Sequence, residues 1–391
     1  MADPKSPEKV VGEVEAVASP PVESPPTESS PPANVTVEQP TVPATDSTST
    51  PAPADATSGL LPPQHWTQID EPENDVGEND SALGDNISST ASLSSLILHY
   101  RTINGRRFHS EQGNAQYWVS NDDQSNEALD INHHVITIMS DGKLHQAPLS
   151  KDIQKAVDIG TGTGTIHSTA DFADEYPNAS VIGTDISPIQ PSWVPPNLEF
   201  QIDDCTQEWT FEENSLDYVH IRFLVGSVID WPALFQQAYR CLKPGGYIES
   251  YEGGPNIGSD DGSVTKTSAM GQWGEIFCEG GRRIGRSFSI VEDEEQRKGI
   301  EAAGFVDIEE KDFKVPIGTW AKDPTLKEAG QYFQAAILQD IEGTLLFIAN
   351  VLGWTKEEIG LFGAHYRHEI RSKSISGFFR QKVVWARKPL E

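Results

Sequence analysis

Apolar and polar positions follow regular periods only in the part of the chain beyond residue 93. From residue 155 onward, short apolar runs alternate with longer segments of helical period, and Gly, Pro or Asn residues separate many of them. This pattern predicts seven strands, at 155–160, 180–185, 198–202, 215–222, 247–251, 305–315 and 381–387. Strands and helices that largely alternate are typical of a parallel sheet covered on both faces, so we expect an α/β fold.

Helical periods occur between these strands and also outside the main alternation. The pattern predicts helices at 126–139, 165–176, 231–242 and 293–303. A glycine-rich stretch over 253–285 interrupts the alternation, and we expect a loop or lid there. Two amphipathic segments, 325–348 and 355–369, predict a helical insertion between the last two strands.

The N-terminal part of the chain shows neither the strand pattern nor the helical period. The first 63 residues hold 14 of the 27 prolines, and no aromatic residue precedes Trp66. Such a segment buries too little apolar surface to offset about 1 to 2 kcal/mol of backbone entropy per ordered residue. We therefore divide the chain into a disordered Pro/Ser/Thr-rich acidic tail (1–90), a helical pre-domain element (91–150) and the α/β domain (151–391).

The charge of the chain narrows the possible partners. The 391 residues include 29 Lys and Arg against 59 Asp and Glu, a net charge of -30, and residues 1–90 carry 16 acids and two lysines, or -14. No basic stripe is present, which argues against direct nucleic-acid binding. The sequence shows no membrane-spanning apolar run and no signal peptide, so we expect a soluble intracellular protein. The three cysteines are widely spaced, which favours reduced thiols over a disulfide framework or a metal site.

The main chemical signal is a glycine run directly after the first predicted strand, Asp158-x-Gly160-x-Gly162-x-Gly164. Such glycines let the backbone approach a ligand closely before a helix begins. A dinucleotide and S-adenosylmethionine both fit a loop of this kind. The dinucleotide fingerprint needs G-x-G-x-x-G, but the third glycine position holds Thr165 or His167 in the two possible registers. The spacing therefore favours S-adenosylmethionine.

Three later positions agree with this interpretation. Asp185 ends the second strand, where a carboxylate can accept hydrogen bonds from both hydroxyls of a ribose. Asp204-Cys205 follows the third strand, and a Lys-Pro-Gly-Gly turn at 243–246 precedes the fifth. Structural alternatives exist: Asp158 as a buried acid that caps the loop, Asp185 as a helix N-cap, and the turn as a helix stop.

The glycine run with its preceding acid resembles the first motif of class I S-adenosylmethionine-dependent methyltransferases. Within that superfamily the chain resembles the fungal LaeA-like methyltransferases, over about residues 95–390. Six segments carry this resemblance: 129–134 followed by 141–145, 171–177, 182–196, and 218–222 with 230–232. The resemblance implies a Rossmann-like sheet whose last pair of strands is antiparallel. It also implies that S-adenosylmethionine is bound by Asp158, Gly160, Thr161, Gly162, Gly164, Asp185, Ile186, Asp204 and Cys205.

The resemblance further implies a nuclear or cytoplasmic regulator of secondary metabolism and development that acts with velvet-type proteins. Some relatives instead belong to biosynthetic clusters and methylate small molecules. One departure is His167, which stands where many relatives have Trp after Ile166. This departure and the acidic tail leave room for a largely non-catalytic interaction scaffold.

Any methyl acceptor should approach at the carboxyl ends of the strands, near the loops after the fourth and fifth strands. His220, Arg222 and Glu252 lie there. His220 is a candidate general base, with a structural histidine as the alternative. The sequence carries no motif that identifies the acceptor.

Overall fold

The computed structural model describes residues 59–69, 100–109, 117–164 and 169–391. The chain divides into two units, 1–54 and 55–391, and all described residues belong to the second. His167, and most of the range predicted to be a disordered tail, lie outside the described residues. No helix in the described part of the chain is long and apolar enough to cross a membrane.

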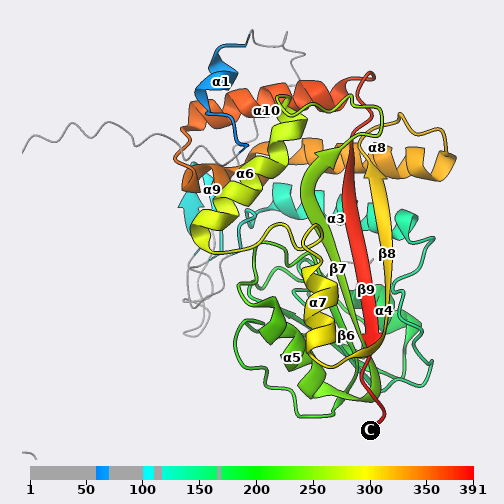
Figure 1. The fold of residues 1–391 in the computed structure, drawn as a ribbon. Helices are drawn as coiled ribbons and strands as arrows, with labels where there is room; N and C mark the ends of the chain where they lie inside the picture. Colours follow the sequence, from blue (N-terminus) through cyan, green and yellow to red (C-terminus); the bar gives the residue numbers. More distant parts are fainter. Residues whose placement is uncertain (1–58, 70–99, 110–116, 165–168) are drawn as a thin grey trace, which may run out of the picture. The chain divides into compact units, whose positions relative to one another are not determined.

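A seven-stranded sheet forms the centre of the second unit (Figure 1), in the order β5-β4-β3-β6-β7-β9-β8. The first five of its strands in the chain run parallel, and β9 is antiparallel to both β7 and β8. This confirms the predicted fold class. The strands are β3 (Lys155–Ile159), β4 (Ser180–Asp185), β5 (Leu198–Ile202), β6 (Leu216–Arg222), β7 (Leu242–Gly258), β8 (Val306–Pro316) and β9 (Phe378–Arg387).

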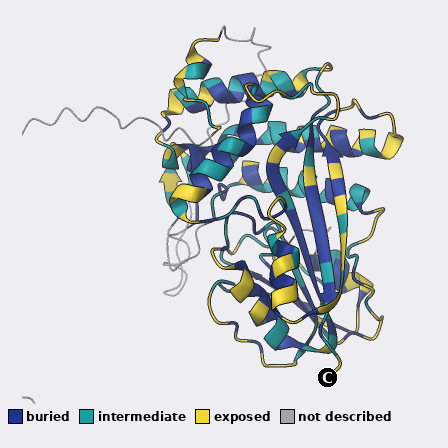
Figure 2. Ribbon diagram, in the orientation of Figure 1, coloured by how far each residue is buried: buried dark blue, intermediate teal, exposed yellow. Residues whose placement is uncertain are grey.

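The helices α4 (Thr169–Glu175), α5 (Trp231–Cys241) and α7 (Glu295–Ala302) pack beside this sheet. Helix α5 shows why these segments are helical: the Asp230 carboxylate accepts a hydrogen bond from the backbone N–H of Ala233, and a proline occupies the first turn. Its buried residues recur at spacings of three and four, so one face packs inward while the other carries exposed residues (Figure 2).

The glycine-rich segment 253–285, which we expected to be a loop or lid, is a loop only over residues 259–268. Strand β7 continues to Gly258, which pairs with Phe378 of β9, and α6 (Ala269–Ile284) follows. The glycines in α6 allow close packing: a Cβ at Gly280 would lie 2.4 Å from the Ile348 side chain. Sequence periodicity missed this element because its glycines serve a contact with a distant helix.

Together with α8 (Pro324–Gln339), α9 (Ile341–Val351) and α10 (Lys356–Arg371), helix α6 forms a helical layer at the far ends of β7, β8 and β9 (Figure 1). The insertion holds three helices rather than the two that were predicted. Asp340 separates α8 from α9, because its carboxylate caps the N-terminus of α9 through the N–H of Gly343.

The pre-domain element contains a hairpin in addition to the predicted helix. Strands β1 (Arg101–Ile103) and β2 (Arg106–Phe108) are joined by Asn104-Gly105, both with positive φ, as a two-residue hairpin turn requires. Helix α3 (Asp123–Met139) follows and packs against α8. The element is therefore helical only in part.

A partly buried arginine joins this hairpin to two helices. The Arg106 guanidinium donates hydrogen bonds to the Asp122 carboxylate at 2.6 and 2.7 Å, and to the Asp340 carboxylate at 2.6 and 2.8 Å. These carboxylates cap α3 and α9 respectively. Because the Asp340 side chain is only 1% exposed, its charge depends on this arginine for compensation.

Part of the predicted tail is folded. Residues 59–69 include the short helix α1 (Gln64–Thr67), and Trp66 is 2% exposed against Phe362 and His365 of α10. The N–H of Leu61 also donates to the Gln272 side chain of α6. The prediction of disorder over 1–90 is wrong for these eleven residues, because one tryptophan buries enough apolar surface to hold the segment on the helical layer.

Candidate cofactor site

The glycine run forms a tight turn between β3 and α4. Gly160, Gly162 and Gly164 all have positive φ, which favours glycine over residues with a side chain. The N–H groups of Gly160 and Thr161 donate to the Thr184 carbonyl of β4, so the turn is fixed to the neighbouring strand. A Cβ at Gly162 would meet no atom within 4 Å and would extend into open space. The backbone is therefore accessible to a ligand at this residue.

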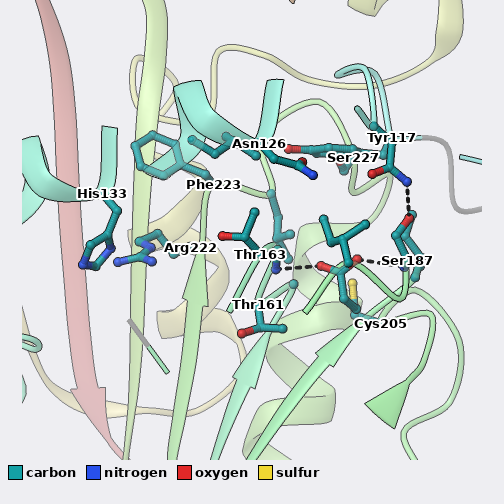
Figure 3. Close-up of a pocket in the computed structure, with 18 of the residues that line it drawn as sticks. Tyr117, Asn126, His133, Thr161, Thr163, Ser187, Cys205, Arg222, Phe223 and Ser227 are labelled. Carbon is teal, nitrogen blue, oxygen red and sulfur yellow. Dashed lines mark hydrogen bonds between the residues drawn. The ribbon is translucent and has the colours of Figure 1, made fainter. Parts of the chain in front are cut away.

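A cavity of about 140 Å³ lies over this turn, at the carboxyl ends of β3, β4, β5 and β6. Strand order reverses at β3, and ligands of open α/β sheets bind at such a switch point. Most of the predicted cofactor residues lie together here: Gly160, Thr161, Gly162, Asp185, Ile186, Asp204 and Cys205. Figure 3 shows part of this lining, with Thr161 and Thr163 on the glycine turn and Cys205 beyond them.

Asp185 is held in place by the glycine turn itself. Its carboxylate accepts hydrogen bonds from the N–H of Gly162 at 2.8 Å and the N–H of Ser187 at 2.9 Å. Burial raises the pKa of Asp185 to about 6, although these backbone donors oppose the shift. The carboxylate retains acceptor capacity toward the cavity, because each of its oxygens has two lone pairs.

The residues after β5 complete the opposite wall of the cavity. Asp204 accepts hydrogen bonds from the N–H and hydroxyl of Thr206, which fixes the turn. Burial raises the pKa of the Cys205 thiol to about 12, so this cysteine is a neutral wall residue and not a nucleophile.

Two predicted cofactor residues, Asp158 and Gly164, are not part of the described cavity lining. Asp158 is 8% exposed and binds Nδ1 of His220 through its carboxylate at 2.8 Å. Burial raises its pKa, but the hydrogen bond and charge of His220 outweigh this effect and hold the pKa well below its usual range. Gly164 packs against Phe200, which a Cβ would approach to 2.5 Å. Both residues support the glycine turn on the side away from the cavity.

His220 occupies the same buried cluster as Asp158. It lines smaller spaces beside Arg222 and His133 and is not among the residues that line the cofactor cavity. This placement agrees with the structural alternative, because a general base must lie within hydrogen-bond reach of the acceptor. Its role as a base stays a prediction without geometric support.

Glu252, which we expected near the acceptor, instead supports the loop after β6. It is fully buried, and its carboxylate accepts hydrogen bonds from the N–H groups of Leu224 and Val225 at 3.0 Å each. Burial raises its pKa to about 8, against these two donors. Glu252 thereby fixes the loop that carries Phe223 and Leu224 to the cavity wall.

Residues of the pre-domain element close the cavity on one side, and they were not among the predicted site residues. The Asn121 amide donates to the Ser187 hydroxyl (Figure 3), and the Thr163 hydroxyl donates to the Asp130 carboxylate of α3. Tyr117 also lines the cavity. Asp130 lies in the 129–134 segment that carries the family resemblance, but no motif indicated that it or Asn121 and Tyr117 would reach the cavity, because their place depends on how α3 packs against the sheet.

The site fits S-adenosylmethionine. The open backbone at Gly162 provides a cradle, and the carboxylates of Asp185, Asp203 and Asp204 give the cavity a negative character that suits a cationic ligand. Among the described residues of the lining, Arg222 is the one arginine or lysine, and it lies at the boundary with the His220 cluster.

Comparisons with known proteins agree with this assignment. A model of a methyltransferase domain matches residues 131–289. Methyltransferase pytC of Aspergillus terreus is 35% identical over 324 residues, which cover 82% of this chain and 98% of that protein. The secondary metabolism regulator LAE1 of Cochliobolus heterostrophus is 32% identical, over 73% of this chain and 94% of that protein. The secondary metabolism regulator laeA of Aspergillus fumigatus is 31% identical, over 78% and 81% respectively.

The fold, the glycine turn and the family match together define a class I methyltransferase that uses S-adenosylmethionine. Within this class, the chain belongs to the LaeA-like family. The resemblance inferred from the sequence is thereby confirmed. The relatives include both regulators and cluster methyltransferases, so family membership alone does not assign the acceptor.

The pKa of Asp185 predicts how cofactor binding depends on pH. Because this pKa is about 6, the carboxyl becomes protonated as the pH falls and becomes a weaker acceptor for the ribose hydroxyls. We expect the affinity for S-adenosylmethionine to fall about tenfold between pH 7 and pH 5, as measured by calorimetry. An Asp185→Asn variant should bind weakly at both pH values with no such slope. Equal wild-type affinity at pH 5 and pH 7 would contradict this assignment.

Proposed function

We propose that this protein is an active methyltransferase of fungal secondary metabolism and that methyl transfer is required for its biological role. One observation carries the proposal: the cofactor cavity adjoins a second cavity, and both are lined by Tyr117, Leu129, Asn132 and Phe223. A second chamber beside the cofactor gives an acceptor a place to bind near the reacting methyl group. A protein that served only as a scaffold would not need one.

When bound, S-adenosylmethionine would supply an electrophilic methyl group on its sulfonium. The acceptor would form the new bond with its own electron pair and lose a proton to water, and the sulfonium sulfur would keep the electron pair of the broken bond. The chain contributes the positioning of the two reactants. The glycine turn and Asp185 hold the cofactor, and the second cavity holds the methyl acceptor. No titratable side chain has to act as a base in this arrangement.

A second candidate function is regulation of secondary metabolism in the nucleus or cytoplasm, together with velvet-type proteins. It is supported by the two regulators that are 31% and 32% identical to this chain. Localisation of a fluorescently tagged full-length chain and its co-purification with velvet-type proteins test this role. A tagged chain that is excluded from the nucleus and retains no such protein would contradict it.

Complementation of a deletion strain tests whether methyl transfer is required. We expect wild-type protein to restore the metabolite profile and Asp185→Ala to fail, with Asp174→Ala as a control, because Asp174 is exposed on α4 and is not among the cavity-lining residues. Equal protein levels must be shown by immunoblotting. Full restoration by Asp185→Ala would favour a scaffold over an enzyme.

A further inference from the structure

The second cavity has a volume of about 230 Å³ and lies between α3 and the helical layer. Helices α6, α8, α9 and α10 contribute to its wall, as do β9 and the end of β7. A cavity of about 150 Å³ accommodates benzene, so this one has room for a fused pair of rings or a substituted ring. The space is small for a folded protein segment but sufficient for a metabolite.

The wall of this cavity is strongly aromatic. Among the described residues that line it, nine are aromatic, and they come from both sides of the chamber. Trp118 of the pre-domain meets Phe277 and Phe288 edge-on, while Trp273 stacks on Tyr366 with ring centroids 4.2 Å apart. Flat aromatic walls favour a flat apolar ligand, because stacking and edge-to-face contacts add to the burial of apolar surface.

The charged groups on this wall already have partners. Asp340 is bound by Arg106 through two hydrogen bonds, and Arg380 lies 3.4 Å from Asp312. In the described part of the lining these are the only ionisable acids and bases other than tyrosines. A charged ligand, such as a lysine or arginine side chain, would therefore lose its hydration without gaining an opposite charge.

Two polar groups in the wall lack partners. The Tyr366 hydroxyl is fully buried, and neither it nor Oδ1 of Asn132 has a hydrogen-bond partner among the described residues. Asn132 lines both cavities, whereas Tyr366 lines only the second. Because an unpartnered buried polar group costs about 1 to 3 kcal/mol, a ligand that supplied a partner would gain affinity at these positions.

We propose that the second cavity binds the methyl acceptor, and that this acceptor is a small uncharged aromatic molecule with at least one hydroxyl or carbonyl group. The inference rests on the proposed methyltransferase function and adds the substrate class. The aromatic wall selects the ring system, and the Tyr366 hydroxyl and the Asn132 amide recognise the polar substituent. The lack of an available opposite charge on the wall argues against a lysine or arginine side chain as the acceptor.

Binding of 2-naphthol to the full-length chain tests this proposal, because the probe carries two fused rings and one hydroxyl. Its fluorescence is titrated in the presence of S-adenosylhomocysteine, and we expect saturable binding to the wild type. Ala336→Phe, which fills the chamber from α8, should weaken binding by roughly tenfold or more. Tyr366→Phe, which removes only the hydroxyl, should weaken it by about fivefold. Tyr332→Phe, at an exposed tyrosine outside the chamber, should have no effect.

Calorimetry with S-adenosylmethionine on the same samples separates this inference from the proposed function. If the wild type binds the cofactor but not 2-naphthol, or if Ala336→Phe binds 2-naphthol as well as the wild type does, the acceptor assignment is overturned and the methyltransferase function stands. If the cofactor does not bind, the proposed function itself fails. Competition by a lysine-rich peptide at equal potency would also overturn the assignment, and unchanged melting temperatures establish that the variants are folded.

Discussion

Replacement of Asp185 by alanine is expected to weaken the binding of S-adenosylmethionine by about 100-fold. The carboxylate lies on the cofactor cavity at the end of β4, and two hydrogen bonds to an ionised acceptor contribute about 1.5 kcal/mol each, or a factor of ten apiece. The same carboxylate accepts from the N–H of Gly162, so its removal also releases the glycine turn. Isothermal titration calorimetry at pH 8, where Asp185 is ionised, measures the effect.

Two controls separate binding from folding in this experiment. Asp174→Ala removes an exposed acid from α4 and should leave the affinity unchanged. Asp185→Asn keeps the size of the side chain and one acceptor oxygen, so it should fall between the wild type and the alanine variant. If an Asp185→Ala variant melts like the wild type and binds the cofactor with undiminished affinity, Asp185 does not contribute to cofactor binding.

Replacement of Arg106 by alanine is expected to lower the free energy of unfolding by about 3 to 5 kcal/mol. The change leaves the Asp340 carboxylate buried without its counter-charge, and loss of one partner of a buried ion pair has an effect of this size. It also releases the hairpin from the N-termini of α3 and α9. Urea denaturation followed by circular dichroism gives the value.

An exposed ion pair provides the matched control. Arg297 lies 3.3 Å from Glu310, and its side chain is 42% exposed, so Arg297→Ala should change the free energy of unfolding by less than about 1 kcal/mol. A double variant, Arg106→Ala with Asp340→Asn, should recover part of the loss because it removes the uncompensated charge. A single Arg106→Ala variant as stable as Arg297→Ala would show that the cluster does not hold the hairpin in place.

The strands around the cofactor site were predictable because their signals are local. Strands β4 and β5 have the predicted bounds, since β4 holds a short apolar run and β5 alternates apolar and polar residues, each between turn residues. Strand β7 was predicted too short, because its extension to Gly258 is stabilised by pairing with β9, more than 100 residues later. The Asn104-Gly105 pair is a typical sequence signal for a hairpin turn. The strands on either side have only three residues each, too few to show a strand period.

The residues of the cofactor site also differ in whether a local sequence signal marks them. The glycine turn and Asp185 follow from spacing alone, because one loop and one strand end position them. Asn121, Asp130 and Tyr117 reach the cavity only through the docking of α3 and the segment before it, which no local pattern encodes. Trp66 was overlooked for a similar reason: its burial depends on helix α10, about 300 residues away.

The length of β7, β8 and β9 has a consequence for how this enzyme can be re-engineered or can diverge. These three strands run from beside the cofactor-binding strands into the layer that borders the second cavity (Figure 1), with one register shift in each of their two pairings. Within the described residues, the two regions therefore share continuous strands, and no separate linker along β7, β8 or β9 would let recombination exchange one region for the other. Changes in acceptor preference should arise by substitution of individual wall residues, while exchange of whole segments between relatives should interrupt the sheet.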